Sequence, residues 1–392
     1  LLSFSLPNIG LAAEYSLTVD PVTIDTGDFT KQGIGYNGAS PGPVLRFKEG
    51  EDVTIKVTNN LSEKTSIHWH GLILPFQQDG VPGISYDGIK PGETFTYNFP
   101  IVQSGTYWFH SHSGFQEPDG AYGAIIIEPT GREPFRFDRE YVIQLTDAHP
   151  QSGNRIMRNL KMMPDYYNRK QRTLFDFLDD SESKGLDAAL SDRADWGDMR
   201  MMPTDIEDVQ GFTPLINGKG PNQNWTGLFE PGERIRLRFI NSSAMTYYDI
   251  RIPGLDLLVV QADGNNVQPV KVDEFRIAVA ETYDVIVRPK EAQAYTIFAE
   301  SMGRTAFARA TLAPQEGMEA AVPEMRAAPL LTMADMGMSH DMEGMDHSAM
   351  SGMDHSAMAG MDHSSMAGGT HTMPDGTVMS GMGEMADPYY AP

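Results

Sequence analysis

His68-Trp69-His70-Gly71 and the later run Thr106-Tyr107-Trp108-Phe109-His110-Ser111-His112 decide how this sequence is interpreted. Each holds a His-x-His pair at the end of a strand-like run. Residues i and i+2 of a strand point to the same face, roughly 6.6–7 Å apart, and neighbouring strands lie about 4.8 Å apart. This spacing is long for two ligands of one small ion, but it suits imidazoles that bind neighbouring ions. We therefore predict that His68, His70, His110 and His112 converge on one patch and hold a metal cluster.

Histidine alone does not name the metal, because imidazole binds copper, zinc, iron and nickel. A single His-x-His pair is more often a chance feature of a surface or a core than a site. Two such pairs, each embedded in aromatic residues and glycine, favour a metal site.

The two motifs together resemble the N-terminal copper motifs of multicopper oxidases. The resemblance implies that His68 binds the type 2 copper and that His70, His110 and His112 bind the paired type 3 coppers. In that family four further cluster histidines, and all ligands of the type 1 copper including a cysteine, come from a C-terminal domain. This sequence contains no cysteine and no His-Cys-His. We therefore expect a fragment that lacks the type 1 copper domain and is inactive alone.

The composition limits the possible classes of protein. A chain of 392 residues should form two or three domains. Its formal charge of −23 argues against nucleic acid, whose phosphates it would repel. The apolar run from Leu1 to Ala13 predicts the remnant of a signal peptide, with an N-terminal strand as the alternative. No other run is long and apolar enough to span a bilayer, so we expect an exported, periplasmic protein. We also expect it to be a monomer when complete.

Short alternating runs separated by glycine and proline predict β-sandwiches. We expect one sandwich over residues 14–133 and a second over 134–315. Their order resembles the first two cupredoxin-like domains of a multicopper oxidase, the second of which carries no copper of its own. The predicted fold is therefore all-β: tandem cupredoxin-like Greek-key sandwiches.

The second predicted domain is interrupted at about residues 152–209 by a segment of helical composition. Leu174, Phe177 and Leu178 follow the i, i+3, i+4 spacing of an amphipathic helix. Two interpretations of the methionines in this segment remain open: filler in helices that cover a sandwich edge, or a thioether lining where Cu(I) docks. These methionines are Met157, Met162, Met163, Met199, Met201 and Met202. An insert of this kind resembles the copper-resistance protein A branch of the multicopper oxidases.

Residues 316–392 have a different composition, which includes three consecutive eight-residue repeats. The segment has little bulky apolar surface and should be disordered without metal. Thioethers select Cu(I), and imidazole and carboxylate also accept Cu(II), so we predict an auxiliary copper-binding linker. Its candidate ligands are Met345, His347, Met350, Met353, His355, Met358, Met361, His363 and Met366. Copper-resistance oxidases carry such segments between their second and third domains.

The resemblance implies an oxidoreductase that oxidises Cu(I) or phenolic substrates and reduces dioxygen to water at a trinuclear copper cluster. The competing hypothesis is a non-catalytic protein that sequesters copper with its repeats. A β protein without metal would leave both the histidine pairs and the repeats unexplained.

Overall fold

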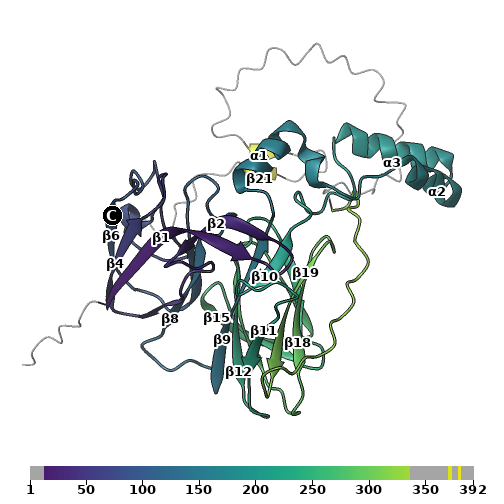
Figure 1. Ribbon diagram of the computed structural model, residues 1–392. Coiled ribbons are helices and arrows are strands. Elements are labelled where there is room, and N and C mark those ends of the chain that lie inside the picture. Colours follow the sequence, from purple (N-terminus) through teal and green to yellow (C-terminus); the bar gives the residue numbers. More distant parts are fainter. Residues whose placement is uncertain (1–12, 336–369, 373–377, 381–392) are drawn as a thin grey trace, which may run out of the picture. The chain divides into compact units, whose positions relative to one another are not determined.

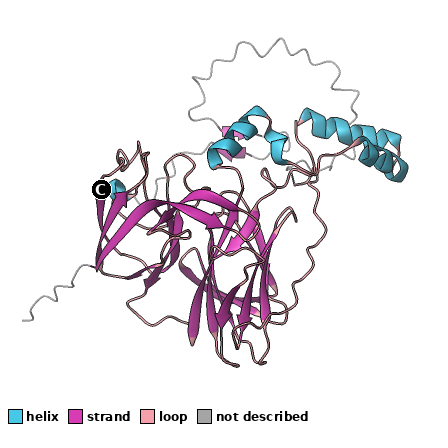
Figure 2. Cartoon of the chain, in the orientation of Figure 1, coloured by secondary structure: helices cyan, strands magenta, loops and turns pink. Residues whose placement is uncertain are grey.

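The computed structural model describes residues 13–335, 370–372 and 378–380 of the chain. Residues through Thr332 belong to one compact unit, which is mostly strands (Figures 1 and 2). In the second unit, β20 (Thr370–Thr372) pairs antiparallel with β21 (Val378–Ser380). The predicted signal-peptide remnant before Ala13 and the Met/His repeats lie outside the described residues. No helix in the described part of the chain is long and apolar enough to cross a membrane.

The first sandwich has two four-stranded sheets. One has the order β2-β1-β4-β6, with the strands Thr30–Tyr36, Ala13–Asp25, Asp52–Asn59 and Thr94–Pro100. The other has the order β3-β8-β7-β5, with the strands Leu45–Lys48, Tyr122–Glu128, Gly105–His110 and His68–His70. A short 3-10 helix, η1 (Phe76–Gln78), follows β5. This non-sequential order makes the chain cross between the sheets, as expected for a Greek-key sandwich.

The second sandwich follows the same plan with larger sheets. Its six-stranded sheet has the order β10-β9-β12-β17-β14-β15, with the strands Thr213–Ile216, Arg139–Ala148, Ile235–Asn241, Thr282–Val287, Leu257–Ala262 and Asn265–Val272. Its five-stranded sheet has the order β11-β19-β18-β13-β16, with the strands Trp225–Leu228, Phe307–Ala313, Tyr295–Ser301, Tyr248–Arg251 and Glu274–Ile277. The fold is thus the predicted all-β pair of cupredoxin-like sandwiches.

The two sandwiches meet along β7, all of whose residues are buried. One face of β7 packs into the first core through Tyr107 and Phe109. The other face carries Thr106 and Trp108, and Trp108 packs with Ile240 of β12. The sandwiches therefore share a buried seam, which fixes the strand that carries His110.

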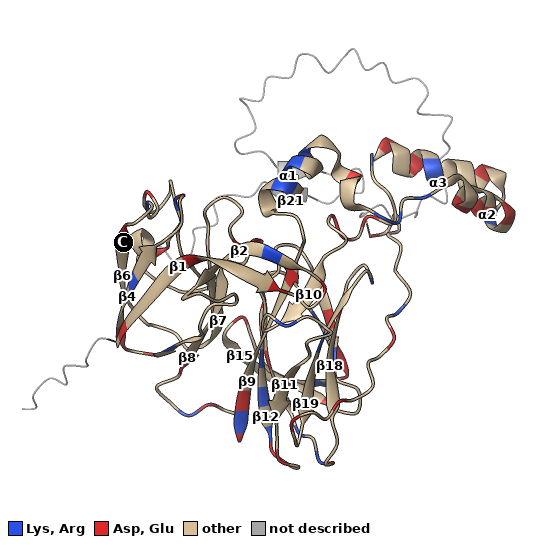
Figure 3. Ribbon diagram, in the orientation of Figure 1, with Lys and Arg blue, Asp and Glu red and all other residues tan. Residues whose placement is uncertain are grey.

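The predicted insert between β9 and β10 is helical, with α1 (Gly153–Met162), the 3-10 helix η2 (Pro164–Tyr167), α2 (Leu174–Lys184) and α3 (Leu186–Asp198). Figure 2 shows these helices gathered beyond one end of the second sandwich. The interpretation that its methionines fill a core is wrong, since none of the six is buried and Met162 is 73% exposed. Leu174 and Leu178, expected on a buried face, are 70% and 53% exposed, because α2 packs mainly on α3. Figure 3 shows acidic positions along α2.

The start of the segment for which the sequence predicts disorder, residues 316–332, lies along the second sandwich. Arg326 binds the carboxylates of Glu274 and Glu300 at 2.8 and 2.6 Å. At its end, the Leu331 N–H donates to the carbonyl of Pro203 in the insert. Ion pairs therefore order this stretch without the bulky apolar residues that its composition lacks.

Candidate metal centre

The register of two short strands brings the histidine motifs together. β5 pairs antiparallel with β7, so that His68 lies opposite His110 and His70 lies opposite Trp108. Trp69, between the two histidines, points into the first core, where it is fully buried against Tyr97. Because side chains alternate along a strand, the core position of Trp69 places both imidazoles on the opposite face.

The four imidazoles converge on one patch, and the prediction that they hold metal stays a prediction. The ring of His68 lies 5.5 Å from those of His70 and His110 and 5.1 Å from that of His112, between centroids. Ligand nitrogens of His68, His110 and His112 all lie within 4.8 Å of one another. His112 follows the end of β7 and is exposed. The spacing within each pair is shorter than the separation expected along an ideal strand.

The indole of Trp108 supports two of these rings. It stacks on His110 at 4.1 Å with an interplanar angle of 14°, and on His70 at 5.0 Å with an angle of 28°. His110 is almost fully buried by these contacts, at 4% exposure. Stacking and burial restrict the rotamers of both imidazoles, which is the preorganisation that a metal site requires.

Hydrogen bonds to the outer nitrogens determine which nitrogen of each ring faces inward. The Nδ1 of His68 donates to the carbonyl of Asp79 at 2.8 Å. The Nδ1 of His110 lies 2.7 Å from the carboxylate Oε2 of Glu117 and 3.2 Å from the carbonyl of Ser111. Such outer partners set the tautomer of a metal-binding histidine. The Nε2 atoms of both rings are therefore left to face the cluster.

Hydrogen bonds of Gln116 connect the segments that carry the two histidine motifs. Its side-chain oxygen accepts hydrogen bonds from Thr65 and Ser111, and its amide nitrogen donates to Glu63 and to the carbonyl of Lys64. Gln116 is 4% exposed, so these bonds have little competition from water. The chain before β5 is thereby tied to the loop after β7.

The electrostatics of the cluster favour neutral imidazoles. Burial lowers the pKa of His70 to about 4, with smaller contributions from His110, His68 and His112. Burial likewise lowers the pKa of His68 and of His112, and the neighbouring histidines add to both effects. Since a metal binds the neutral imidazole, the nitrogens are ready for an ion at neutral pH.

The nitrogens also fit the geometry of metal ligands. The Nδ1 of His70 lies 3.3 Å from the Nε2 of His110. Two nitrogens about 2.0 Å from one ion, at a tetrahedral angle, are about 3.3 Å apart. The spacing therefore suits one ion shared by His70 and His110, with the remaining histidines beside it.

Comparison with known proteins identifies the class. Family models described as multicopper oxidase match residues 18–132 and 159–322. The chain belongs to the multicopper oxidases, whose metal is copper. In structure it is similar to a laccase from Botrytis aclada, with a TM-score of 0.62 and 26% identity over 81% of this chain and 55% of that one. It is also similar in fold to Fet3p, a multicopper oxidase that functions in iron import, with a TM-score of 0.63 and 23% identity over 81% of this chain and 55% of that one.

Within the family the chain is similar to copper-resistance proteins. It is 56% identical over 342 residues to copper resistance protein A of Escherichia coli, across 86% of this chain and 56% of that protein. It is 53% identical over 339 residues to copper resistance protein A of Pseudomonas syringae pv. tomato, across 86% of this chain and 55% of that protein. The chain thus spans a little over half the length of these relatives.

Three residues of the site were missed by sequence reasoning: Asp79, Gln116 and Glu117. All lie in loops, and their contacts depend on how each loop returns to the strands. The nearest signal is the turn-rich run Ser113-Gly114-Phe115-Gln116-Glu117 directly after His112, where polar residues follow a ligand motif. Asp79 has no signal of its own beyond the glycine that follows it.

Proposed function

We propose that this chain carries the N-terminal half of the trinuclear copper site of a copper-resistance multicopper oxidase. In this proposal His68 holds the type 2 copper, and His70, His110 and His112 hold the type 3 pair. The observation that carries it is the convergence of the four imidazoles, with the Nδ1 of His70 and the Nε2 of His110 3.3 Å apart. The other cluster ligands and the type 1 site would come from a segment such as the longer relatives contain.

When bound, such a cluster supplies the chemistry of four-electron reduction of dioxygen to water. The residues of this chain would bind the copper ions, orient the histidine ligands and keep water away from the cluster. Trp108 stacks on His70 and His110 and excludes water from that side of the cluster. Glu117 holds the Nδ1 proton of His110, and the Asp79 carbonyl holds that of His68. These contacts leave the Nε2 lone pairs of His68 and His110 available for metal.

The names of the relatives suggest the substrate. Copper resistance protein A suggests Cu(I) as the reductant, and the laccase suggests phenols. We also propose a periplasmic location for the whole protein. In the sequence the absence of cysteine leaves no thiolate for a type 1 copper, so this chain alone should show no intense blue absorption and no oxygen uptake.

Copper counting tests the proposal. The full chain is loaded with Cu(II), dialysed against a weak chelator, and compared with His70→Gln and His110→Gln. We expect each substitution to remove copper and the nitrogen hyperfine structure from the electron paramagnetic resonance spectrum, while circular dichroism is unchanged. Unchanged copper content and spectra in both variants would exclude these histidines as ligands.

The eight-residue repeats favour a second candidate function, copper sequestration without turnover. Each repeat contains two methionines and one histidine, as in Met345, His347 and Met350. These are enough donors for a three-coordinate Cu(I) site. The candidates are distinguished by oxygen uptake in a longer protein that contains this chain: sequestration predicts bound copper but no uptake.

A further inference from the structure

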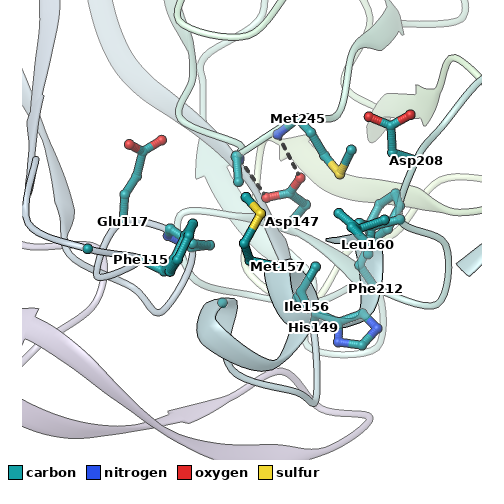
Figure 4. Close-up of a pocket in the computed structure, with 15 residues that line it drawn as sticks. Phe115, Glu117, Asp147, His149, Ile156, Met157, Leu160, Asp208, Phe212 and Met245 are labelled. Atoms are coloured by element: carbon teal, nitrogen blue, oxygen red, sulfur yellow. Dashed lines mark hydrogen bonds between the residues drawn. The ribbon is translucent and has the colours of Figure 1, made fainter. Parts of the chain in front are cut away.

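A second concave site lies beside the histidine cluster. Its volume is about 380 Å³, and it is formed where five segments meet: the loop after β7, the end of β9, α1, the segment before β10 and the loop after β12. Figure 4 shows the side chains that line this pocket, with Asp147, Met157 and Met245 near its centre. The pocket lies within the compact unit and is distinct from the patch where the four imidazoles converge.

The polar groups of the pocket favour a cation. Three carboxylates line it, those of Glu117, Asp147 and Asp208, and none of its lining residues, all of which the structure describes, is lysine or arginine. An anion or a phenolate would meet only negative charge there. The remaining lining is largely apolar, with Phe115 and Phe212 among it. A hard, strongly hydrated cation loses more hydration energy on entering such a lining than a soft one does.

Two thioethers identify the class of cation. Met157 of α1 and Met245 of the loop after β12 both line the pocket, and Figure 4 draws their sulfur atoms on either side of the Asp147 carboxylate. Both residues are partly exposed, so an ion from solvent can reach them. Thioether sulfur is a soft ligand that selects Cu(I) over hard divalent ions.

Hydrogen bonds fix Met245 in this arrangement. The Asp147 carboxylate accepts from the backbone N–H groups of Ala244 and Met245, at 2.9 and 3.3 Å, and from the Thr246 hydroxyl at 2.7 Å. Asp147 is therefore a positioning residue that also supplies negative charge to the pocket that both methionines line.

The imidazole of His149 is engaged elsewhere. Its Nδ1 accepts a hydrogen bond from the N–H of Gln151 at 3.0 Å, and its ring packs edge-on against Tyr167 at 5.4 Å. The two methionines are thus the candidate ligands, and His149 lines the pocket without acting as a ligand.

We propose that this pocket is a Cu(I)-binding site formed by Met157 and Met245 around the charge of Asp147. It is a second copper site, separate from the imidazole cluster, and it requires no oxygen reduction there. The two sites are neighbours, because Glu117 lines the pocket while its carboxylate contacts His110. Of the six methionines of the insert, only Met157 lines this pocket. The second methionine of the pocket, Met245, lies outside the insert.

Methyl resonances of methionine test the proposal in the full chain. The chain is labelled with [13C]methyl-methionine, and Ag(I), a soft and redox-inert stand-in for Cu(I), is titrated in. Met157→Leu and Met245→Leu assign the two resonances and conserve side-chain volume, so both variants should fold as the parent does. Met162→Leu is the matched control, since Met162 lies on the same helix but is 73% exposed and outside the pocket.

We expect the Met157 and Met245 resonances to move along one common saturation curve. In Met157→Leu, the Met245 resonance should need at least about tenfold more Ag(I) for half-saturation, as expected when one of two ligands is lost. Met162→Leu should leave the curve unchanged. His70→Gln, which removes a cluster ligand but keeps the contact of His110 with Glu117, should also leave it unchanged, so that failure of the pocket and failure of the cluster are distinguishable.

Other outcomes would overturn the proposal. Resonances of Met157 and Met245 that stay in place while other methionines respond would show that the pocket does not bind the ion. A response to 2,6-dimethoxyphenol without a response to Ag(I) would make it an aromatic site instead. Direct titration with Cu(I) under anaerobic conditions, against a competing chelator, should show one site fewer in the double leucine variant.

Discussion

The Nε2 of His110 points at the Nδ1 of His70 from 3.3 Å away, while the Nδ1 of His110 lies 2.7 Å from a carboxylate oxygen of Glu117. The carboxylate therefore decides which nitrogen of His110 carries the proton. A carboxylate–histidine contact of this kind raises the basicity of the metal-facing nitrogen and fixes the ring. Glu117 should matter for copper although it does not touch the ion.

Substitution of Glu117 tests this dependence. Glu117→Leu should lower the affinity of the cluster for copper by roughly 10- to 100-fold, the usual effect of losing an outer partner. Glu117→Gln should restore part of that loss, because its amide oxygen still accepts the Nδ1 proton. The copper that each variant retains after dialysis against chelators of increasing strength measures its affinity. Equal losses in the two variants would mean that negative charge, and not the hydrogen bond, is what His110 needs.

Gly80 offers a backbone test of the same cluster. It has φ +79°, and a Cβ there would lie 1.7 Å from the carbonyl oxygen of Ile67, directly before His68. Gly80→Ala should push the loop from the strand, separate the Asp79 carbonyl from the Nδ1 of His68 and reduce bound copper. Gly83→Ala is the control: its φ is +78°, but nothing lies within 4 Å of a Cβ. Both lose about 1–2 kcal/mol to backbone strain, so only a copper loss confined to Gly80→Ala supports this explanation.

The seam between the sandwiches depends on a buried ion network. Asp284 of β17 is 1% exposed and binds Arg236 and Arg238 of β12, at 2.5 and 3.1 Å. It also accepts a hydrogen bond from Thr106 of β7 at 2.7 Å. Asp284→Ala leaves two buried guanidinium groups without this partner, and breaking a buried pair in this way costs about 3–5 kcal/mol.

Urea unfolding measures the loss. The matched control is Asp256→Ala, which removes a pair with Lys271 whose side chains are 64% and 63% exposed. Exposed pairs contribute about 0–1 kcal/mol, so this variant should unfold almost as the parent does. If Asp284→Ala also matches the parent, the network does not stabilise the seam.

The sequence predicts the strands and the four cluster histidines, because both depend on local patterns: alternation, turn residues and the His-x-His spacing. It does not predict Glu117 or Asp79 as partners, since a loop contact is set by tertiary structure. In α2 a local pattern predicts the helix correctly but not the burial of its apolar side chains. Leu174 and Leu178 have helical spacing, yet they remain exposed because the spacing predicts a helix and does not specify what covers it.

The repeats from Met345 to Gly368 can be separated from the cluster by deletion. They lie outside the described residues, and their role as an auxiliary Cu(I) site remains a prediction from composition. The deletion should reduce the Cu(I) that the chain binds, and the loss should scale with the number of repeats removed. It should leave the Cu(II) retained by the cluster unchanged, because the repeats supply none of its four histidines. If an isolated repeat peptide binds no Cu(I) under reducing conditions, the segment is only a linker and not a copper site.

The final prediction concerns pH and the metal-free protein. The pKa of His70 is lowered from 6.5 to about 4, mainly by burial, so the folded chain holds this imidazole neutral where the unfolded chain protonates it. Between those values the unfolded state binds more protons, and the free energy of unfolding therefore falls as the pH falls from about 6.5 to 4. After a discount for partial exposure, His70 should account for about 2 kcal/mol of that loss. Urea unfolding in a chelator at pH 7 and pH 4.5 measures it, and His70→Gln should flatten the dependence by that amount. A parallel pH dependence in the variant would show that His70 is not held neutral by its surroundings.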